Sequence, residues 1–367
     1  MQFIDLQAQY QQHKTQIDGA IARVLDHGQF LFGPEITQLE KQLAAYVGVK
    51  HCIAMSSGTT ALQVALMALN VGPGDEVITT PFSFFATAEV IYLLGATPVY
   101  VDIDPDTYLL DPALLEAAMT AKTKAIIPVS LYGQCADMDA INIIAKRHHI
   151  PVIEDAAQSM GAVYKNKKSC ALSEIACTSF FPSKPLGGYG DSGACFTNDD
   201  RIAESMRLII NHGQHSRYHH VAIGMNGRMD TLQAAVLLEK LAIFDEELKQ
   251  RQAVAQWYGE ALSSFLKPPM VSAYNYCAFA QYTVQVNNRD DVQRALSAAG
   301  IPTAVHYPVG LHQQPVVAHI AGKQTFSFPV TERISKRVMS LPFHPYLEKE
   351  TVKIIAETLE NLITVTA

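Results

Sequence analysis

Cysteine pairs at the spacing of a metal site or a redox motif are missing from this sequence of 367 residues. The six cysteines are scattered without a CxxC pair, which argues against a disulfide framework and against a thiolate zinc site. We expect them to be buried as small apolar side chains; they are Cys52, Cys135, Cys170, Cys177, Cys195 and Cys277. Four histidines gather in NHGQHSRYHH, but no neighbouring cysteine or carboxylate pattern completes a ligand set, so no metal is expected there. Loop or substrate-pocket histidines are the favoured interpretation of His212, His215, His219 and His220.

Long apolar runs and an excess of positive charge are also missing. No stretch approaches the roughly 18 apolar residues of a membrane-spanning helix, and the opening MQFIDLQAQYQQHK lacks the basic start and apolar run of an export signal. A formal net charge of −7, with scattered lysines and arginines, gives no general attraction to nucleic acid or anionic lipid. We therefore expect a cytoplasmic protein with neither a nucleic acid nor a membrane partner.

Composition and length indicate a large folded core in two units. Apolar residues make up 49% and charged residues 17% of the chain, and 367 residues exceed one ordinary domain. From about residue 50 to 200, short apolar runs alternate with helical patterns such as LLEAAMTA, which is typical of an α/β domain with a mostly parallel sheet. A long helical pattern over 229–252 precedes an α+β pattern that includes strand-like PTAVHY. We predict a large α/β domain over 1–245 and a small α+β domain over 246–367, with the N-terminal helix joining the small domain or lying along a subunit edge.

The loops that follow the predicted strands are chemically unusual. In a parallel sheet, ligands bind in the loops at the carboxyl ends of the strands. Polar loops occur there four times, with the sequences SSGTT, TPFSFFAT, EDAAQS and FPSKPLGGYGDSG. We interpret the four loops as parts of a single site.

The first of these loops has the composition of a phosphate site. Ser57, Gly58, Thr59 and Thr60 precede a strong helical pattern, so that backbone amides and hydroxyls stand at a helix N-terminus, where the dipole favours an anion. An ordinary serine or threonine helix cap is the alternative interpretation.

The third and fourth loops each hold a candidate catalytic group. A buried run ends at Glu154 and Asp155, and a carboxylate beside a heteroaromatic nitrogen keeps that nitrogen protonated; a helix cap is the alternative. Lys184 is bracketed by Pro182 and Pro185 and followed by glycines, the setting of a held lysine whose amine can lose its proton and attack a carbonyl. A solvated surface lysine is the alternative here.

A phosphate cup, an acidic partner for a ring nitrogen and a Schiff-base lysine are the three groups that pyridoxal phosphate requires of a protein. With these residues in this order, the sequence resembles the sugar aminotransferases of the DegT/DnrJ/EryC1/StrS family. The resemblance runs nearly end to end, through FLFGPEITQLE, SSGTTAL, EDAAQS, SFFPSKPLGGYGDSG, GMNGRMDTLQAA and AVHYP. It implies the aspartate aminotransferase type of fold, known as fold type I.

The resemblance also implies how the cofactor is held. Lys184 would form the Schiff base, Asp155 would pair with the pyridine nitrogen, and Gln158 would contact the 3-oxygen side of the ring. The phosphate would be bound by Gly58, Thr59 and Ser179. Phe84 would stack on the ring, although the spacing leaves core packing of Phe84, with Phe85 facing the cofactor, as the alternative.

Substrate and partner contacts follow from the same resemblance. Asn226 matches the position that reaches the cofactor phosphate of a neighbouring subunit, which implies an obligate homodimer with shared active sites. Arg228 is a candidate for binding a substrate anion, and a surface salt bridge is its alternative. His306 and Tyr307 would contact the sugar.

The reaction implied is a pyridoxal phosphate-dependent transamination in a ping-pong cycle, with glutamate as donor and a keto group of a nucleotide-linked sugar as acceptor. Lys184 would be both the covalent anchor and the general acid and base. Some relatives carry histidine in place of this lysine and are dehydratases, whereas this chain keeps Lys184.

The motifs are most similar to those of enzymes that aminate C3 of a UDP-linked 3-keto-N-acetylglucosaminuronate for surface polysaccharide (O-antigen) synthesis. Amination of C4 or C3 of a dTDP- or UDP-linked deoxy keto sugar is the competing expectation. A sensor that binds pyridoxal phosphate or a nucleotide sugar without turnover is the alternative outside enzymes. A nicotinamide-dependent dehydrogenase is disfavoured, because no GxGxxG follows the early strands.

Overall fold

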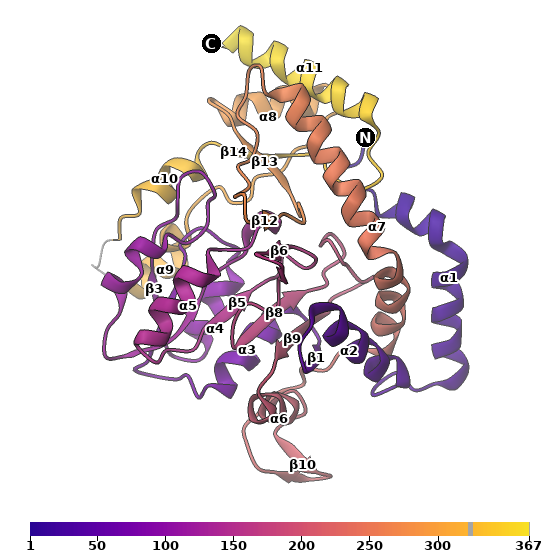
Figure 1. Ribbon diagram of the computed structural model, residues 1–367, viewed down its shortest axis with the longest axis vertical. Helices are drawn as coiled ribbons and strands as arrows, with labels where there is room; N and C mark the ends of the chain where they lie inside the picture. Colours follow the sequence, from indigo (N-terminus) through magenta and orange to yellow (C-terminus); the bar gives the residue numbers. More distant parts are fainter. Residues whose placement is uncertain (322–325, 367) are drawn as a thin grey trace.

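The computed structural model describes residues 1–321 and 326–366 (Figure 1). At its centre is a sheet of seven strands in the order β3-β2-β4-β5-β8-β9-β1. Two hydrogen-bonded groups of strands meet where β4 and β5 run parallel, through the bridges Ile126–Val152 and Val129–Asp155. The strands are β1 (His51–Met55), β2 (Glu76–Thr79), β3 (Thr97–Tyr100), β4 (Thr123–Ile127), β5 (Ile153–Asp155), β8 (Ile175–Ser179) and β9 (Gly193–Thr197). Only β9 pairs antiparallel with its neighbours, so the predicted α/β class with a mostly parallel sheet is confirmed.

Both faces of the sheet are buried, which explains why the strands read as continuous apolar runs. Successive residues point to opposite faces, and accordingly Val77 and Ile78 belong to different hydrophobic clusters. Helices α2, α5 and α7 pack on one face, and α3, α4 and α6 pack on the other. The five shorter helices of this set are α2 (Pro34–Val47), α3 (Gly58–Ala68), α4 (Ala86–Leu93), α5 (Met138–Arg147) and α6 (Asp200–Ile209).

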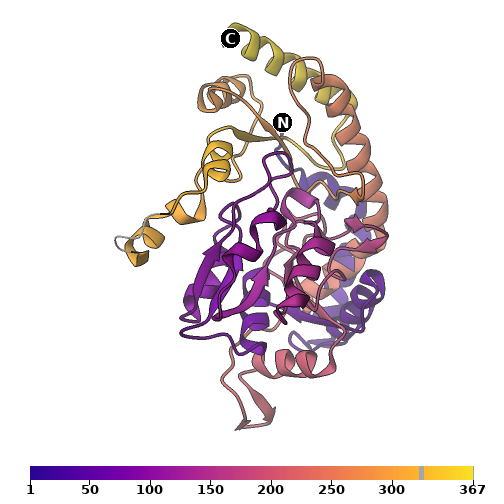
Figure 2. The same ribbon diagram turned by 60° about the vertical axis from the view of Figure 1, so that its left-hand side comes forward.

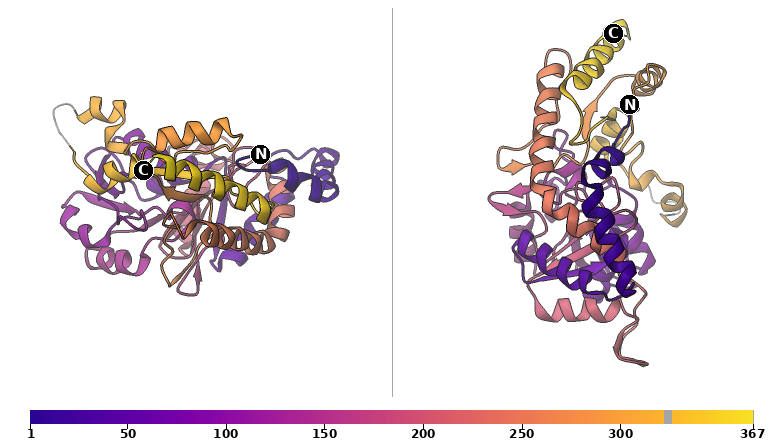
Figure 3. Two further views of the ribbon diagram at one scale, coloured as in Figure 1. Left: turned by 90° about the horizontal axis from the view of Figure 1, so that it is seen from above. Right: turned by 90° about the vertical axis from the view of Figure 1, so that its right-hand side faces the viewer.

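Helix α7 (Thr231–Leu262) links the sheet to the C-terminal part of the chain. The sequence pattern predicts this helix but ends it near Gln252, ten residues too early. Its first half contributes Phe244 to the core under the sheet, whereas its second half contributes Tyr258 to a separate C-terminal core. Helix α1 (Leu6–His27) lies along α7, as Figure 3 shows.

The C-terminal core is built around the antiparallel pair β13 (Tyr282–Gln285) and β14 (Val338–Leu341). Helices α8 (Arg289–Ala298) and α11 (Lys349–Thr366) pack on it, and the shorter α9 (Pro315–Ala321) and α10 (Pro329–Ser335) extend to one side (Figure 2). The predicted boundary between residues 245 and 246 falls within α7 and stays a prediction.

Minor elements complete the chain. A small sheet joins β12 to β6 and β7, and the hairpin of β10 and β11 stands away from the body in Figures 1 and 2. Their bounds are β6 (Val163–Tyr164), β7 (Lys167–Lys168), β10 (Gln214–Ser216), β11 (His219–His220) and β12 (Asn275–Tyr276). The short 3-10 helices are η1 (Pro112–Leu114), η2 (Glu116–Ala118), η3 (Leu131–Gly133) and η4 (Leu311–Gln313). Across the described helices, none is both long and apolar enough to cross a membrane.

Two local predictions are wrong. The helical pattern LLEAAMTA forms only η1 and η2, because Leu115 is its one fully buried side chain and a single anchor does not hold a longer helix. The strand-like PTAVHY makes one isolated bridge, from Ala304 to Ser340, and then turns toward the sheet edge where the polar loops meet.

Candidate active site

The four polar loops lie at one edge of the central sheet, as the topology predicts. The loop after β1 touches the end of β8 so closely that a Cβ on Gly58 would lie 2.7 Å from Ser179 Cβ. Thr87, after β2, donates a hydrogen bond to Asp155 at the end of β5. Lys184, after β8, interacts electrostatically with Asp155. The single site predicted from the loops is therefore present in the fold.

The first loop combines a helix cap with free amides. Ser57 Oγ accepts the amide of Thr60 at 3.0 Å, so Ser57 is the N-cap of α3. The amides of Gly58 and Thr59 have no partner within the helix, as at any helix N-terminus. The two interpretations of this loop are thus compatible, because Ser57 caps the helix while the next two amides remain available to an anion.

Asp155 is buried, with 4% of its surface exposed, at the carboxyl end of β5. Its Oδ2 accepts the hydroxyl of Thr87 at 2.9 Å, and its Oδ1 accepts the amide of Ala157 at 3.2 Å. Burial raises the pKa of Asp155, and these two hydrogen bonds and the charge of Lys184 oppose the rise. A turn follows Asp155 instead of a helix, so the residue does not serve as a helix cap.

Gln158 connects this loop to two others. Its Oε1 accepts the amide of Tyr132 at 2.7 Å, and its Nε2 donates to the hydroxyl of Tyr307 at 3.1 Å. The hydroxyl of Tyr132 in turn donates to the carbonyl of His306. The segment that carries His306 and Tyr307 is thereby tied to the sheet edge next to Asp155.

Lys184 lies half-buried in the loop between β8 and β9. Its own amide donates to the carbonyl of Phe181 at 2.9 Å, and a Cβ on Gly187 would lie 2.4 Å from the carbonyl oxygen of Pro182. Glycine is therefore needed for this tight turn. Burial lowers the pKa of Lys184 to about 8, against the opposing charge of Asp155, so that about one amine in ten is neutral at pH 7.

The structure distinguishes between the two neighbouring phenylalanines. The side chain of Phe84 is 58% exposed, and its ring centroid lies 6.3 Å from that of Tyr307. Phe85 packs instead in a small cluster that includes Ala88 and Tyr100. Phe84 is thus the residue that faces the site, and Phe85 belongs to the core.

Arg228 and Asn226 lie beside the phosphate loop, because Gly227 between them accepts the amide of Ser56 at 2.9 Å. Arg228 Nε donates to Asn226 Oδ1 at 2.9 Å, and its guanidinium lies 5.5 Å from the ring centroid of Phe32. Within residues 1–321 and 326–366, Arg228 makes no ion pair, which speaks against the surface salt bridge considered for it.

His306 is held as a neutral imidazole. Its Nδ1 is hydrogen-bonded to Ser340 Oγ at 2.9 Å. Burial and the nearby charge of Lys184 lower the pKa of His306 to about 4. The neutral ring can therefore donate a hydrogen bond to a sugar hydroxyl, or accept one from it, at neutral pH.

The comparison with known protein families agrees with this geometry. The model of the DegT/DnrJ/EryC1/StrS aminotransferase family matches residues 11–360. The chain belongs to this family.

Individual members resemble this aminotransferase along all or most of their length. A UDP-2-acetamido-2-deoxy-3-oxo-D-glucuronate aminotransferase from Pseudomonas aeruginosa is 59% identical over 98% of this chain and 100% of its own length. The crystal structure of a DegT DnrJ EryC1 StrS aminotransferase from Brucella abortus superposes with a TM-score of 0.95 at 43% identity, covering 99% of each chain. The structure of ntda from Bacillus subtilis with its bound cofactor PMP has a TM-score of 0.90 at 32% identity, covering 99% of this chain and 83% of that one.

The enzyme is a pyridoxal phosphate-dependent aminotransferase of fold type I. The residues at the sheet edge fit this cofactor. The free amides of Gly58 and Thr59 suit a phosphate, the buried carboxylate of Asp155 suits a protonated ring nitrogen, and the depressed pKa of Lys184 suits Schiff-base formation.

The structure adds residues that the sequence analysis missed. The buried hydroxyls of Ser83 and Thr87 are hydrogen-bonded at 2.9 Å, and the Thr87 hydroxyl donates in turn to Asp155. Their place in the polar loop TPFSFFAT was a usable signal, although Ser83 precedes α4 and Thr87 lies in its first turn. Tyr132 gave no such signal, because it reaches Gln158 through a backbone amide whose direction depends on the η3 turn.

Proposed function

We propose that this aminotransferase moves an amino group from glutamate to C3 of a UDP-linked 2-acetamido-2-deoxy-3-keto-glucuronate. The observation that carries the proposal is Arg228, a half-buried guanidinium without a carboxylate partner among the described residues, beside the phosphate loop. A uronate carboxylate would fill this need through a bidentate pair. The 59% identity to the Pseudomonas aeruginosa enzyme supports the same sugar.

The cofactor is held by residues from four loops in this proposal. Gly58, Thr59 and Ser179 bind its phosphate, Asp155 keeps its ring nitrogen protonated, and Gln158 contacts the 3-oxygen side of the ring, which Phe84 covers. When bound, pyridoxal phosphate supplies an electron-withdrawing ring that makes a proton on the attached α-carbon easy to remove.

Lys184 anchors the cofactor covalently and then acts as the proton carrier. With Nζ released, the Lys184 amine would take up the proton from the donor α-carbon and give it back to the bound donor–cofactor adduct within the same half-reaction. A pKa of about 8 leaves the amine able to do both near neutral pH. The thirteen-residue link of β8 to β9 keeps the amine beside Asp155, because Pro185 and the Gly187 turn fix the loop.

A homodimer with shared sites is also proposed. Asn226 is exposed in the protomer, which supports a role in binding the cofactor phosphate of the second copy. The β10–β11 hairpin next to it and the segment that follows carry exposed apolar side chains, with Tyr218 79% and Ile223 87% exposed, which suits burial against a partner. His306 and Tyr307 contact the sugar from the protomer that supplies Lys184.

Mixed dimers test the shared site. Lys184→Ala and Asn226→Ala variants are each expected to be nearly inactive alone. If one site combines Lys184 of one copy with Asn226 of the other, a mixed dimer contains one intact site and recovers activity on subunit exchange. Absence of recovery in verified mixed dimers would contradict sharing.

The substrate is tested by a matched pair of sugars. Arg228→Gln should lower kcat/KM about 10- to 100-fold for the UDP-linked 3-keto-glucuronate derivative, the loss of a charge-assisted pair. It should change kcat/KM little for UDP-linked 3-keto-N-acetylglucosamine, which lacks the carboxylate. Preference of the wild-type enzyme for a dTDP-linked deoxy keto sugar would refute the assignment, and binding without turnover would favour the sensor alternative.

A further inference from the structure

A large cavity lies outside the cluster of residues around Lys184. It has a volume of about 560 Å³ and opens between the Asp104–Tyr108 loop after β3 and the C-terminal core. Tyr108 lines the cavity and stands edge to face with Tyr132, with ring centroids 6.0 Å apart. The lining contains none of the residues assigned to the cofactor. The space is therefore distinct from the site that holds the cofactor. Volumes of this size are typical of small-molecule sites.

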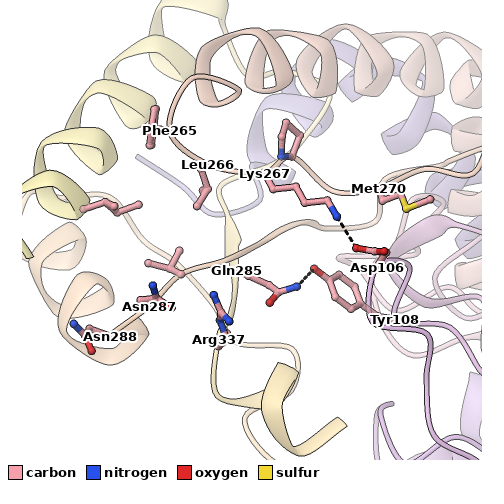
Figure 4. A pocket seen from close by; sticks show the side chains of 13 residues that line it. Asp106, Tyr108, Phe265, Leu266, Lys267, Met270, Gln285, Asn287, Asn288 and Arg337 are labelled. Atoms are coloured by element: carbon pink, nitrogen blue, oxygen red, sulfur yellow. Dashed lines mark hydrogen bonds and ion pairs between the residues drawn. The ribbon is translucent and has the colours of Figure 1, made fainter. Parts of the chain in front are cut away.

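Two contacts join the walls of the cavity (Figure 4). Lys267, in the segment after α7, pairs with Asp106 at 2.5 Å, and Gln285 Nε2 donates to the Tyr108 hydroxyl at 3.0 Å. The Lys267–Asp106 pair is largely exposed and therefore adds little stability. It does neutralise the charge of Asp106, so Asp106 is not available to balance other cations in the lining.

Arg337 is the cation left without a counterion. Its backbone is fixed, since its carbonyl accepts the amide of Val286 at 2.8 Å and its amide donates to Ile334 at 2.9 Å. Its guanidinium makes no hydrogen bond or ion pair with another part of the described chain, and Nε is fully buried. A partly buried charge without a partner is costly, and an anion in the cavity would remove that cost.

The rest of the lining is divided into polar and apolar parts. Asn287 and Asn288 follow β13 and present side-chain amides that bind no other described residue. Phe265, Leu266 and Met270 form an apolar wall on the segment after α7, as Figure 4 shows. Such a lining suits a molecule with one anionic group, hydrogen-bonding groups and an apolar or ring portion.

We propose that this space, the Arg337 cavity, binds a small organic anion through one carboxylate or phosphate group. Arg337 pairs with the anionic group, and the ring or apolar portion packs on Phe265 and Leu266. Because Asp106 and Tyr108 belong to the loop after β3 while Arg337 belongs to the C-terminal core, a bound molecule connects the two parts. Tyr108 is also in ring contact with Tyr132, whose hydroxyl donates to the carbonyl of His306.

Calorimetric titration of the holoenzyme tests the cavity with defined probes. Phenyl phosphate and benzoate carry the two anionic groups on the same ring, and benzyl alcohol is the neutral control. Saturable binding of at least one anion, with none of the alcohol, is expected. The tighter of the two anions identifies phosphate or carboxylate as the preferred group.

Variants locate the binding. Arg337→Gln should weaken the bound anion at least tenfold, equivalent to about 1.4 kcal/mol. Arg333→Gln, an exposed arginine on α10 outside the cavity, should change the affinity less than twofold. Asn287→Trp, which fills the space while Arg337 stays, should also abolish binding. Each variant is checked for an unchanged melting temperature and cofactor spectrum.

Hydrogen exchange supplies a readout that does not depend on a single substitution. The anion should protect residues 104–108 and 265–270 together in the wild-type enzyme and neither segment in Arg337→Gln. No saturable binding of either anion, equal affinity in Arg337→Gln, or protection confined to other segments would each overturn the proposal.

Discussion

Replacement of Thr87 by valine removes one hydroxyl from Asp155, the buried carboxylate that we propose pairs with the cofactor ring. Valine has nearly the same shape as threonine, so the substitution takes away the hydrogen bond to Asp155 Oδ2 without opening a cavity. Thr87 is 1% exposed, and water therefore cannot take the place of the lost donor. The carboxylate of Asp155 becomes harder to keep ionised, and its pKa rises further above its ordinary value.

The size of the effect follows from the charge of the acceptor. A hydrogen bond to an ionised group contributes about 1.5 to 3 kcal/mol, and each pKa unit corresponds to about 1.4 kcal/mol. The pKa of Asp155 should therefore rise further when this hydrogen bond is lost. The protonated acid cannot hold the ring nitrogen in its cationic form, so kcat/KM on the acid side of the profile should fall about 10- to 100-fold.

The assay is the pH profile of kcat/KM, together with a pH titration of the visible absorbance of the bound cofactor. In Thr87→Val both should show an acid limb shifted to higher pH. Thr87→Ser keeps the hydroxyl and should restore the wild-type limb. Ser83→Ala removes a group that touches Thr87 and not Asp155, so its shift should be less than half as large.

A Thr87→Val enzyme whose acid limb and absorbance titration coincide with those of Thr87→Ser would refute the reasoning. A uniform loss of activity at every pH would do the same, because it would show a structural defect in place of a change in ionisation.

Two further substitutions test the site and the core. Gly58→Ala places a Cβ 2.7 Å from Ser179 Cβ and should weaken cofactor binding at least tenfold, as measured by spectroscopic titration. Gly72→Ala is the control, because Gly72 has open space around it. Equal cofactor affinities of the two variants would contradict the close approach at Gly58. Burial raises the pKa of Glu154 to about 7 from an ordinary 4.5, so its contribution to stability is present below pH 4.5 and is lost as pH rises through 7. Between pH 4.5 and 8 the unfolding free energy of the wild type should drop by roughly 3 kcal/mol relative to Glu154→Gln, measured by urea denaturation, and parallel pH curves would contradict this.

Much of the fold could be predicted because its information is local. Strands buried on both faces must be apolar throughout, and their alternation with helices forces parallel crossovers. Those crossovers in turn bring the loops that carry Gly58, Asp155 and Lys184 to one edge. By contrast, LLEAAMTA has the local pattern of a helix and PTAVHY that of a strand, but neither forms the expected element. Tertiary packing buries only one side chain of LLEAAMTA and gives PTAVHY only one β-bridge.

The amino-acid sequence by itself determined the fold class and the family, since each depends on residue type and spacing along the chain. Only the tertiary structure decided that Phe84 and not Phe85 faces the site, that Thr87 supports Asp155, and that Arg337 is left without a counterion. These outcomes depend on groups far apart in sequence, such as Thr87 and Asp155, whose distance and orientation are set by the packing of whole strands and helices and by no local pattern.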